Sequence, residues 1–332
     1  MKFTSAIFII TGLGVVSANP LLQKRASTSE SASLGYATLS GGTTGGGSAT
    51  PVTVTTLDEL KNAVTGNAAK VVVISGSITG NEVVKVGSNT SVLGKSGAST
   101  SLVTVSLGHV IENTAALNGV GLRVIDVSNV IIRNLKINKV LAKAGDAIGV
   151  QAANRVWIDS LELWSDKDHN KDYYDGLLDI THGCYAVSVT NSYLHDHWKA
   201  SLVGHSDNNE KEDLGIQVTY AYNKWQNLNS RTPSFRFGHG HIFNNYFLSN
   251  QDGINTRVGA ELLVQNNVWE GCKNSVYSTD NGYANVSGND YGGKDATALA
   301  TTWNSVGYSY ALKDASEVKA YVESVAGAKL SF

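Results

Sequence analysis

Three aspartates in the middle of this sequence have side chains suited to binding a hard metal ion. Asp175 and Asp179 belong to an acidic segment, residues 166–179, and Asp146 lies upstream of it. Ca²⁺ takes roughly six to eight oxygen ligands in irregular geometry, so carboxylates from separate segments predict a calcium site. On an extended strand Asp175 and Asp179 would be about 13 Å apart. They share one ion only if Gly176 allows a bend; otherwise they serve different ions.

The acidic segment does not fit the continuous calcium loop of an EF-hand, which requires glycine at its sixth position. With Asp166 first, the sixth residue is Lys171; with Asp168 first, it is Tyr173. The EF-hand is therefore excluded. Two interpretations remain, a solvated acidic loop or one part of a site assembled across the fold.

Three basic side chains form the second group that could carry chemistry. Lys199 ends the segment 195–199, and Arg231 and Arg236 flank Pro233. Five residues apart on a straight strand, the two arginines would face opposite ways. A bend at Pro233 would let them converge. Isolated cations are usually solvated surface charges, but together with the aspartates these three indicate a site for an anionic substrate.

The composition limits which partners the protein can have. The sequence has 332 residues, of which 42% are hydrophobic and 16% charged, enough for one large domain. A formal net charge of −2 gives no general attraction to nucleic acid. No segment after the first residues approaches the roughly twenty apolar residues of a membrane span. We therefore expect a monomer with no nucleic-acid or membrane partner.

The first residues predict export. Lys2, an apolar run over 6–16 and the small residues of 16–18 are typical of a signal peptide, residues 1–18. The dibasic pair at 24–25 favours removal of a short propeptide, residues 19–25, although such a pair also occurs by chance in a flexible leader. Residues 26–332 would then form the mature domain, secreted and extracellular.

A short repeat supplies the elements that must position these side chains. Segments with alternating β-branched, aromatic and polar residues recur at 130–137, 156–163, 187–194, 218–225, 242–247 and 264–269, with a weaker copy at 286–291. The residue after the first strand of each copy falls at positions 134, 160, 191, 222, 244, 266 and 288, so that the shortest steps are 22 residues. Such a period with strand-like alternation predicts a β-solenoid.

The solenoid carries several expectations with it. A coil of about 22 residues holds three short strands and three turns, and coils stack about 4.8 Å apart around an apolar interior. Asparagines at the marked turn are expected to form a structural ladder. The two steps of 31 residues, 160–191 and 191–222, indicate loops that line a binding groove on one side.

Three smaller features complete the expected domain. Thr56 followed by residues 57–64 predicts a short capping helix over the first coil. Cys184 and Cys272 lie between three and four coils apart, too far for a disulfide, and both are expected to be free thiols. Asn89 and Asn285 begin glycosylation sequons that require surface exposure.

These motifs resemble the fungal branch of the pectate lyase family, which also contains pectin lyases and several pollen allergens. The matching segments run through most of residues 35–293, at 35–38, 73–76, 87–90, 156–159, 172–179, 194–207 and 231–237. The resemblance implies an all-β, single-domain, right-handed parallel β-helix, which agrees with the repeat. It also implies calcium-dependent eliminative cleavage of (1→4)-α-D-galacturonan, the de-esterified pectin of plant cell walls, leaving unsaturated ends.

The resemblance also implies roles for individual residues, carried over position by position. The calcium ligands would be Asp146, Asp175 and Asp179. The catalytic base would be Arg231, an unusual base because guanidinium groups hold their protons tightly, and the groups that hold substrate carboxylates would be Lys199 and Arg236.

Two departures from the family pattern are visible. Asp175 stands where many members have Glu, which shortens the reach of that ligand. Ser160 replaces a His that often follows Val-Trp-Ile-Asp.

Three alternative functions stay open at the level of sequence. A pectin lyase would act on neutral methyl esters without the acidic calcium site. A galacturonan hydrolase would need two carboxylates as acid and base across the scissile bond. A non-catalytic solenoid would only bind cell-wall glycan. Unsaturated products that depend on calcium would distinguish the lyase from each of them.

Overall fold

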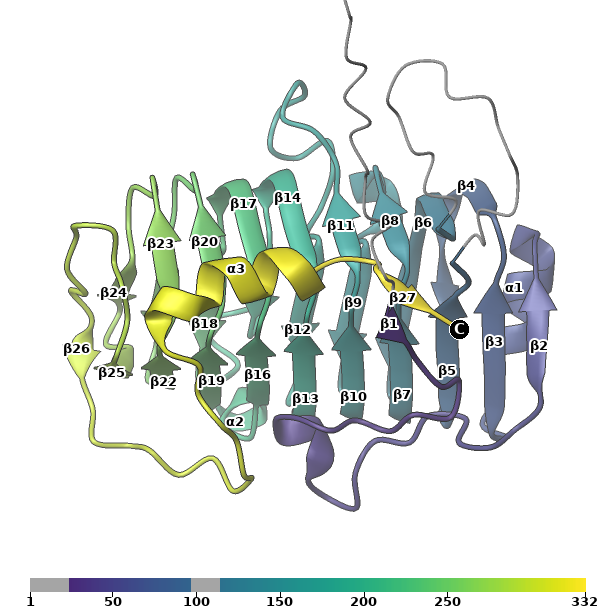
Figure 1. The fold of residues 1–332 in the computed structure, drawn as a ribbon, viewed down its shortest axis with the longest axis horizontal. Helices are drawn as coiled ribbons and strands as arrows, with labels where there is room; N and C mark the ends of the chain where they lie inside the picture. Colours follow the sequence, from purple (N-terminus) through teal and green to yellow (C-terminus); the bar gives the residue numbers. More distant parts are fainter. Residues whose placement is uncertain (1–23, 97–113) are drawn as a thin grey trace, which may run out of the picture.

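The chain folds into a solenoid of stacked coils (Figure 1). The structure, a computed structural model, describes residues 24–96 and 114–332. Strands of successive coils pair in parallel. One sheet has 11 strands in the order β2 (Pro51–Val54), β3 (Lys70–Ile74), β5 (Thr90–Gly94), β7 (Ser128–Arg133), β10 (Asn154–Asp159), β13 (Tyr185–Thr190), β16 (Gln217–Ala221), β19 (His239–Phe243), β22 (Glu261–Gln265), β25 (Tyr283–Ser287) and β26 (Leu299–Ala300).

The second sheet has 14 strands and divides at the long strand β6 (Ala116–Ile125), which also pairs with β4 (Ser77–Lys85). One branch continues through β8 (Lys136–Asn138), β11 (Glu162–Trp164), β14 (Tyr193–Lys199), β17 (Lys224–Ser230), β20 (Tyr246–Leu248) and β23 (Val268–Glu270). The other continues through β9 (Ile148–Gln151), β12 (Leu178–Thr181), β15 (Leu202–Val203), β18 (Ser234–Arg236), β21 (Ile254–Arg257) and β24 (Val276–Thr279).

This architecture confirms the predicted single-domain parallel β-helix. A middle coil consists of the three short strands β10, β11 and β12, as the repeat indicates. Val130, Val156 and Val187 occupy one register column of β7, β10 and β13, and all three are fully buried. Burying a side chain of this size is worth about 1.5–3 kcal/mol, so contacts between coils stabilise the fold.

An asparagine ladder exists, but it lies one residue after the predicted positions. The Asn245 Oδ1 atom accepts hydrogen bonds from both the N–H and the side-chain amide of Asn223, each at 3.0 Å. The column consists of Ser192, Asn223, Asn245, Asn267 and Asn289. The marker residues are instead turn residues with φ between 48° and 64°: Asn134, Ser160, Asn191, Tyr222, Asn244, Asn266 and Gly288. The ladder assignment was therefore wrong by one position.

The predicted capping helix is confirmed as α1 (Leu57–Val64). The Thr56 hydroxyl accepts a hydrogen bond from the Glu59 N–H at 3.3 Å, and the Glu59 carboxylate accepts one from the Thr56 N–H at 3.1 Å. This reciprocal pair is a capping box. Leu60 and Val64 are buried in the main core, so α1 covers the open end of the first coils (Figure 1). Two short 3₁₀ turns, η1 (Tyr36–Thr38) and η2 (Ala142–Ala144), also interrupt the strands.

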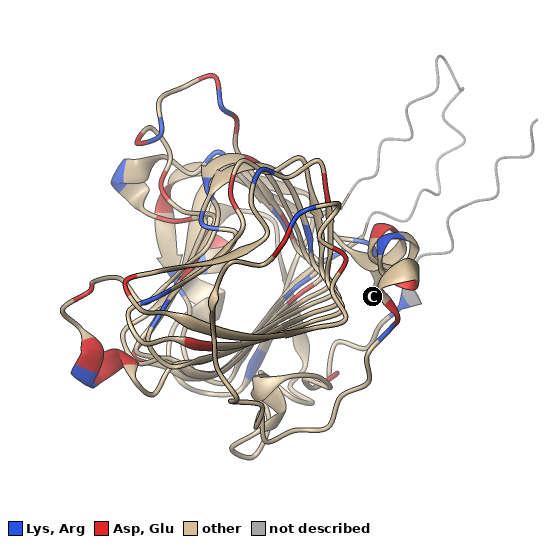
Figure 2. Ribbon diagram, turned by 90° about the vertical axis from the view of Figure 1, so that its left-hand side faces the viewer, with Lys and Arg blue, Asp and Glu red and all other residues tan. Residues whose placement is uncertain are grey.

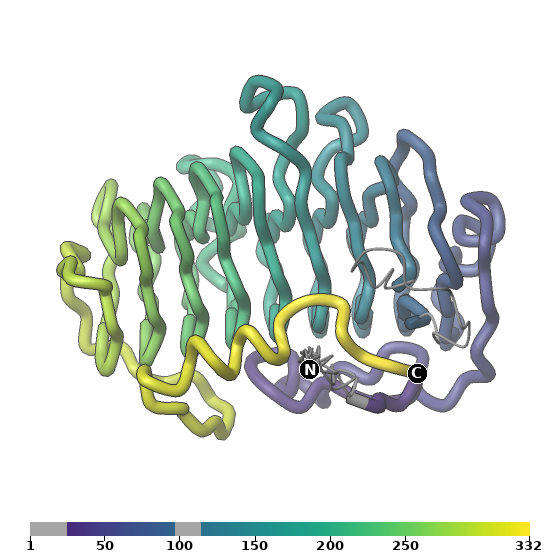
Figure 3. The backbone as a smooth tube through the Cα atoms, turned by 45° about the horizontal axis from the view of Figure 1, so that its top comes forward, coloured from purple at the N-terminus to yellow at the C-terminus, as the bar shows by residue number. Residues whose placement is uncertain are grey.

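The C-terminal segment returns along the outside of the solenoid (Figure 3). Its helix α3 (Ala315–Val325) buries Val318 and Val322 against Tyr246 and Val268. Strand β27 (Leu330–Ser331) then pairs in parallel with β1 (Lys24–Arg25). The dibasic pair thus lies in a strand, whereas the predicted signal peptide and the rest of the propeptide lie outside the described residues.

Both cysteines are free, as the coil spacing predicts. Cys184 and Cys272 are buried, and their sulfur atoms accept hydrogen bonds at 3.4 Å from the N–H groups of Ala153 and Asn250 respectively. Burial raises the pKa of Cys184 to about 12, so this thiol stays protonated. Both residues pack as core side chains.

The two long steps of the repeat are loops, as predicted. The first, residues 165–177, connects β11 to β12; the second, residues 204–216, connects β15 to β16 and contains α2 (Glu210–Asp213). Viewed along the coils, charged loops project from one side of the solenoid (Figure 2).

Candidate active site

The predicted site residues lie at strand ends on one side of the solenoid. Asp146 and Asp175 come shortly before β9 and β12, and Asp179 is the second residue of β12. Lys199 and Arg236 end β14 and β18, and Arg231 directly follows β17. Parallel pairing in register carries each strand end to the same side, so residues far apart in sequence become neighbours. The structure brings together all six: Asp146, Asp175, Asp179, Lys199, Arg231 and Arg236.

Asp146 and Asp179 converge above Gly176. A Cβ atom on Gly176 would lie 2.4 Å from Asp179 Oδ1 and 2.9 Å from Asp146 Oδ1, so only glycine leaves room for both oxygens. The Gly176 N–H donates to Asp146 Oδ1 at 3.0 Å, and the Leu202 N–H donates to Asp179 Oδ1 at 3.0 Å. Gly176 is thus part of the site because its missing side chain leaves room for the two carboxylates.

The electrostatics of this pair favour a cation between the two carboxylates. Burial, and next the charge of Asp175, raise the pKa of Asp146. Burial, and next the charge of Asp146, raise the pKa of Asp179 well above its usual range. Two buried carboxylates that repel one another are stabilised by a shared divalent cation. The donor set is oxygen only, as a hard cation requires.

Asp175 lies beside this pair, but its carboxylate is turned toward Lys199. Lys199 Nζ lies 3.2 Å from Asp175 Oδ1 and 3.4 Å from Asp172 Oδ1. Within residues 24–96 and 114–332, no group of three or more His, Cys, Asp and Glu side chains is arranged to hold a metal ion. Of the three predicted ligands, Asp146 and Asp179 therefore lie together, whereas Asp175 pairs with the side chain of Lys199.

His197 fixes the backbone of Asp175, a role that the sequence did not reveal. Its Nε2 atom lies 2.6 Å from the Asp175 carbonyl oxygen, so Nε2 carries the hydrogen. Burial lowers the pKa of His197 to about 4, and the imidazole is neutral at pH 7. His197 and Lys199 are two residues apart on β14, so they share one face of the strand, and both contact Asp175. One strand thus positions the peptide and the side chain of the same residue.

Arg231 has a left-handed backbone conformation, with φ of 61°. Its N–H donates to Asp252 Oδ2 at 3.0 Å, and the Tyr277 hydroxyl donates to Asp252 Oδ1 at 2.6 Å. Its guanidinium reaches back toward the carboxylate pair, where Nη1 lies 3.3 Å from Asp179 Oδ2. Arg231 shares this conformation with turn residues of other coils, and its side chain lies against the acidic cluster.

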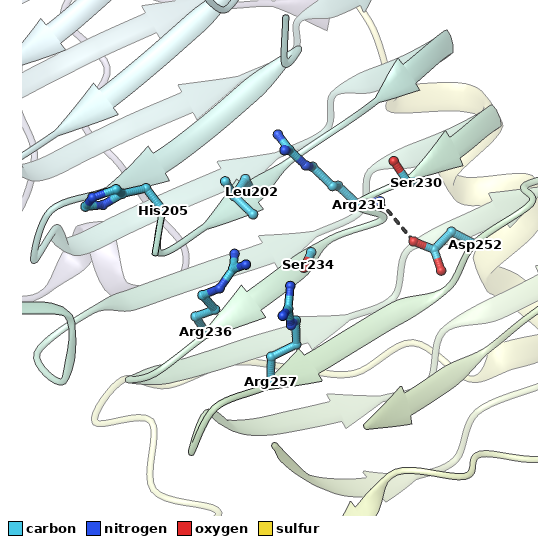
Figure 4. A pocket seen from close by; sticks show the side chains of 8 residues that line it. All are labelled: Leu202, His205, Ser230, Arg231, Ser234, Arg236, Asp252 and Arg257. Carbon is cyan, nitrogen blue, oxygen red and sulfur yellow. Dashed lines mark hydrogen bonds between the residues drawn. The ribbon is translucent and has the colours of Figure 1, made fainter. Parts of the chain in front are cut away.

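Next to this cluster lies a polar groove of about 280 Å³. Figure 4 shows Arg236 and Arg257 side by side, with Arg231 above them. Arg236 pairs with Asp207, and Arg257 pairs with Asp280 at 3.1 Å. The lining residues are Leu202, His205, Ser230, Arg231, Ser234, Arg236, Asp252 and Arg257. Arg231 and Arg236 therefore line one groove, as the bend at Pro233 predicts.

The sequence did not single out His205, Asp252 or Arg257. Arg257 is in register with Arg236 on the neighbouring strand, so its place in the groove follows from the strand pairing alone. An isolated arginine after Ile-Asn-Thr carries no motif, and only the 22-residue period could have placed it.

The fold and the groove together define a class of protein. A row of guanidinium groups along a β-solenoid, beside a buried acidic cluster, suits an enzyme that binds an extended acidic polymer. The chemistry of such a site is proton transfer and charge stabilisation next to carboxylates.

Comparison with known proteins identifies the family. The family model described as pectate lyase matches residues 5–331. "Probable pectate lyase A" of Aspergillus fumigatus is 50% identical over 339 aligned residues, with all of both chains covered. "Pectate lyase A" of Emericella nidulans is 52% identical, covering 95% of this chain and 91% of its own length. The chain belongs to the pectate lyase family, and the protein is a polysaccharide lyase.

A solved structure agrees with this assignment. A pectate lyase from a Bacillus species in complex with trigalacturonate aligns with a TM-score of 0.76 and 28% identity, covering 89% of this chain and 98% of that one. Within the described residues, no helix is long and apolar enough to cross a membrane.

Proposed function

We propose that this polysaccharide lyase cleaves de-esterified (1→4)-α-D-galacturonan by calcium-dependent β-elimination. The observation that carries the proposal is the contact of Arg231 with Asp179, next to Asp146 and at the edge of a groove lined by arginines. The groove is cationic where a polyuronate would lie, and the related Bacillus enzyme was solved with trigalacturonate.

Asp146, Asp179 and Asp175 would hold the calcium ion. The first two present oxygens on either side of the space above Gly176, and Asp175 lies close enough to raise the pKa of both. When bound there, Ca²⁺ supplies positive charge beside the substrate carboxylate, which favours loss of the neighbouring C5 proton.

Arg231 would take the C5 proton. It would accept the proton as a neutral guanidine, because a guanidinium has only donor groups. The side chain contacts Asp179 and also lines the groove, so it reaches both the acidic cluster and the space for substrate. As that bond breaks, its electron pair forms the C4–C5 double bond, and the C4–O bond breaks. The new chain end is an unsaturated 4-deoxy-galacturonosyl residue. The departing oxygen takes up a proton from water and becomes a hydroxyl group of the other product.

Lys199 and Arg236 would hold substrate carboxylates on the two sides of the reacting sugar. Lys199 presently contacts Asp175 and Asp172, and Arg236 contacts Asp207 and the Gly204 carbonyl oxygen. Guanidinium and ammonium groups recognise carboxylates by charge-assisted hydrogen bonds. Holding two carboxylates fixes the sugar ring relative to Arg231.

One assay tests the reaction. We expect polygalacturonate to yield products that absorb ultraviolet light, with the activity removed by a chelator and restored by added calcium. Highly methylated pectin should react more slowly, because neutral esters do not pair with the cations. Chelator-insensitive release of saturated ends would contradict the proposal and favour a hydrolase.

We further propose that the enzyme is exported as a monomer. The apolar leader of residues 1–18 supports export, and a pectin-degrading enzyme meets its substrate outside the cell. Size-exclusion chromatography of the protein purified from culture medium tests both statements.

A further inference from the structure

Arg123 is a cation near the acidic cluster that none of the roles above includes. It belongs to β6, and its Nη1 atom lies 3.0 Å from Asp146 Oδ2. The side chains of Arg123 and Asp146 are only 14% and 11% exposed. A charge-assisted hydrogen bond this far from water is stronger than a surface ion pair.

Two glycines make room for this contact. Gly149 is in register with Arg123 on one side and with Asp179 on the other. A Cβ atom on Gly149 would lie 1.6 Å from Arg123 Nη1, and one on Gly145 would lie 2.4 Å from Nη2. The guanidinium therefore occupies the space of two missing side chains, between its own strand and the carboxylate that it contacts.

Both oxygens of Asp146 are thereby fixed by protein donors. Oδ1 accepts from the Gly176 N–H at 3.0 Å, and Oδ2 accepts from Arg123 at 3.0 Å. Two donors on different oxygens leave the carboxylate little freedom to rotate. This matters because Asp146 lies next to Asp179 and Asp175, and repulsion among these charges favours turning it away.

We propose that Arg123 is the positioning residue of the calcium site. It holds Asp146 beside Asp179 against their mutual repulsion, so that both carboxylates present oxygens to one ion. Groups that orient metal ligands in this way usually affect metal affinity strongly. The charge of Arg123 also repels a calcium ion, but its contact with Asp146 offsets that repulsion, and positioning dominates. This inference rests on the proposed calcium dependence.

Calorimetric titration of the full-length protein with calcium chloride tests the inference without any measurement of activity. Arg123→Ala should weaken calcium binding roughly tenfold or more. Arg123→Lys keeps the charge but loses the planar fork, and should recover only part of the affinity.

Gly149→Ala offers a second route to the same displacement. Its Cβ would push the flexible end of Arg123 out of its place, while the backbone at this position accepts alanine. It should weaken calcium binding as Arg123→Ala does. The double variant should bind no more weakly than Arg123→Ala alone, because both changes remove one contact.

The controls separate this inference from the proposed function. Lys136→Ala removes a cation of similar exposure that pairs with Glu162 at 3.2 Å on another branch of the sheet, and should bind calcium like the wild type. Asp179→Asn should abolish binding. If wild type and Asp179→Asn both fail to bind calcium, or both bind equally, the proposed calcium site is wrong. If Asp179→Asn alone loses binding while Arg123→Ala or Gly149→Ala binds as well as or better than wild type, the positioning role is wrong.

Discussion

At the scale of single residues, each carboxylate of the acidic cluster contacts a different cation. Asp146 pairs with Arg123, Asp175 with Lys199, and Asp179 with Arg231. Such pairing offsets part of the desolvation cost of placing three carboxylates in a partly buried space. It also places two of the proposed substrate-binding or catalytic cations within reach of the ion-binding oxygens, which couples the two halves of the site electrostatically.

Replacing the proposed base separates chemistry from binding. Arg231→Lys should reduce kcat by about 10²–10⁴-fold, because the lysine amine cannot place a proton-accepting nitrogen where those of Arg231 lie. Calcium affinity measured by calorimetry should change little. Retention of most of the wild-type kcat would exclude Arg231 as the base.

The charged carboxylate of Asp179 should lower the stability of the folded protein unless a cation is bound. Its pKa is raised in the folded state, so the folded protein binds a proton that the unfolded chain releases near pH 4. In a chelator, stability should therefore fall as the pH rises above about 4. Asp179→Asn should raise the melting temperature in chelator at pH 7 and remove the increase that calcium produces. Scanning calorimetry with and without calcium measures both effects; an unchanged calcium response in the variant would contradict the assignment.

At the scale of elements, the repeat could be predicted and its register could not. The turn contains two consecutive asparagines in two of the copies, Asn244–Asn245 and Asn266–Asn267, and in the sequence either one could be the ladder residue. Which of each pair points inward depends on the left-handed turn at the first residue, and no neighbouring glycine marks that turn. The strand pattern itself is unambiguous because burial on the inner face imposes alternation.

An asparagine inside the ladder should contribute more to the free energy of unfolding than one at the end of the ladder. Asn245 is fully buried; it accepts from Asn223 and donates to the carbonyl oxygens of Tyr220 and Phe243. Asn245→Ala leaves these groups unpaired and should cost about 2–4 kcal/mol in the free energy of unfolding. Asn289→Ala, at the more exposed end, should cost less. Urea denaturation of both variants compares them, and equal costs would mean that the ladder does not stabilise the fold.

Only part of the candidate site could be predicted from the sequence, because the register of the strands was not known. Asp175, Asp179 and the arginines around Pro233 stood out because they lie in short charged segments, whereas Asp146 was added from its place upstream and from the family resemblance. Arg123, Asp252 and Arg257 are isolated charges, and they join the site only through strand register and loop paths. The orientation of Asp175 toward Lys199 also depends on β14, which the sequence placed only approximately.

At the scale of the whole molecule, the two ends of the described chain are fastened together. β1 pairs with β27, and the buried Arg133 contacts Glu30 at 2.9 Å and Asp159 at 2.6 Å while it lies over the Trp157 ring. The N-terminal and C-terminal segments thus lie along the same side of the solenoid (Figure 3).

Processing at the dibasic pair should remove the β1–β27 pairing but leave one backbone contact between the two ends. Cleavage after Arg25 removes β1 but keeps the hydrogen bond from the Ala26 N to the Ser331 carbonyl oxygen, at 2.8 Å. We expect Edman sequencing of the secreted protein to begin at Ala26. An Arg25→Ala variant should begin at Asn19, after removal of the signal peptide only. A wild-type chain that begins at Asn19 would show that the pair is not processed.

The returning C-terminal segment sets a limit on how the solenoid can change in length. The segment must reach from the last coil back to the strand at the N-terminus, and α3 spans part of that path with a fixed length. Each duplicated coil would move the two attachment points apart by about 4.8 Å. The length of this C-terminal segment therefore has to match the number of coils that it spans. Gain or loss of such a coil during evolution would have to be matched by a change in the length of the segment.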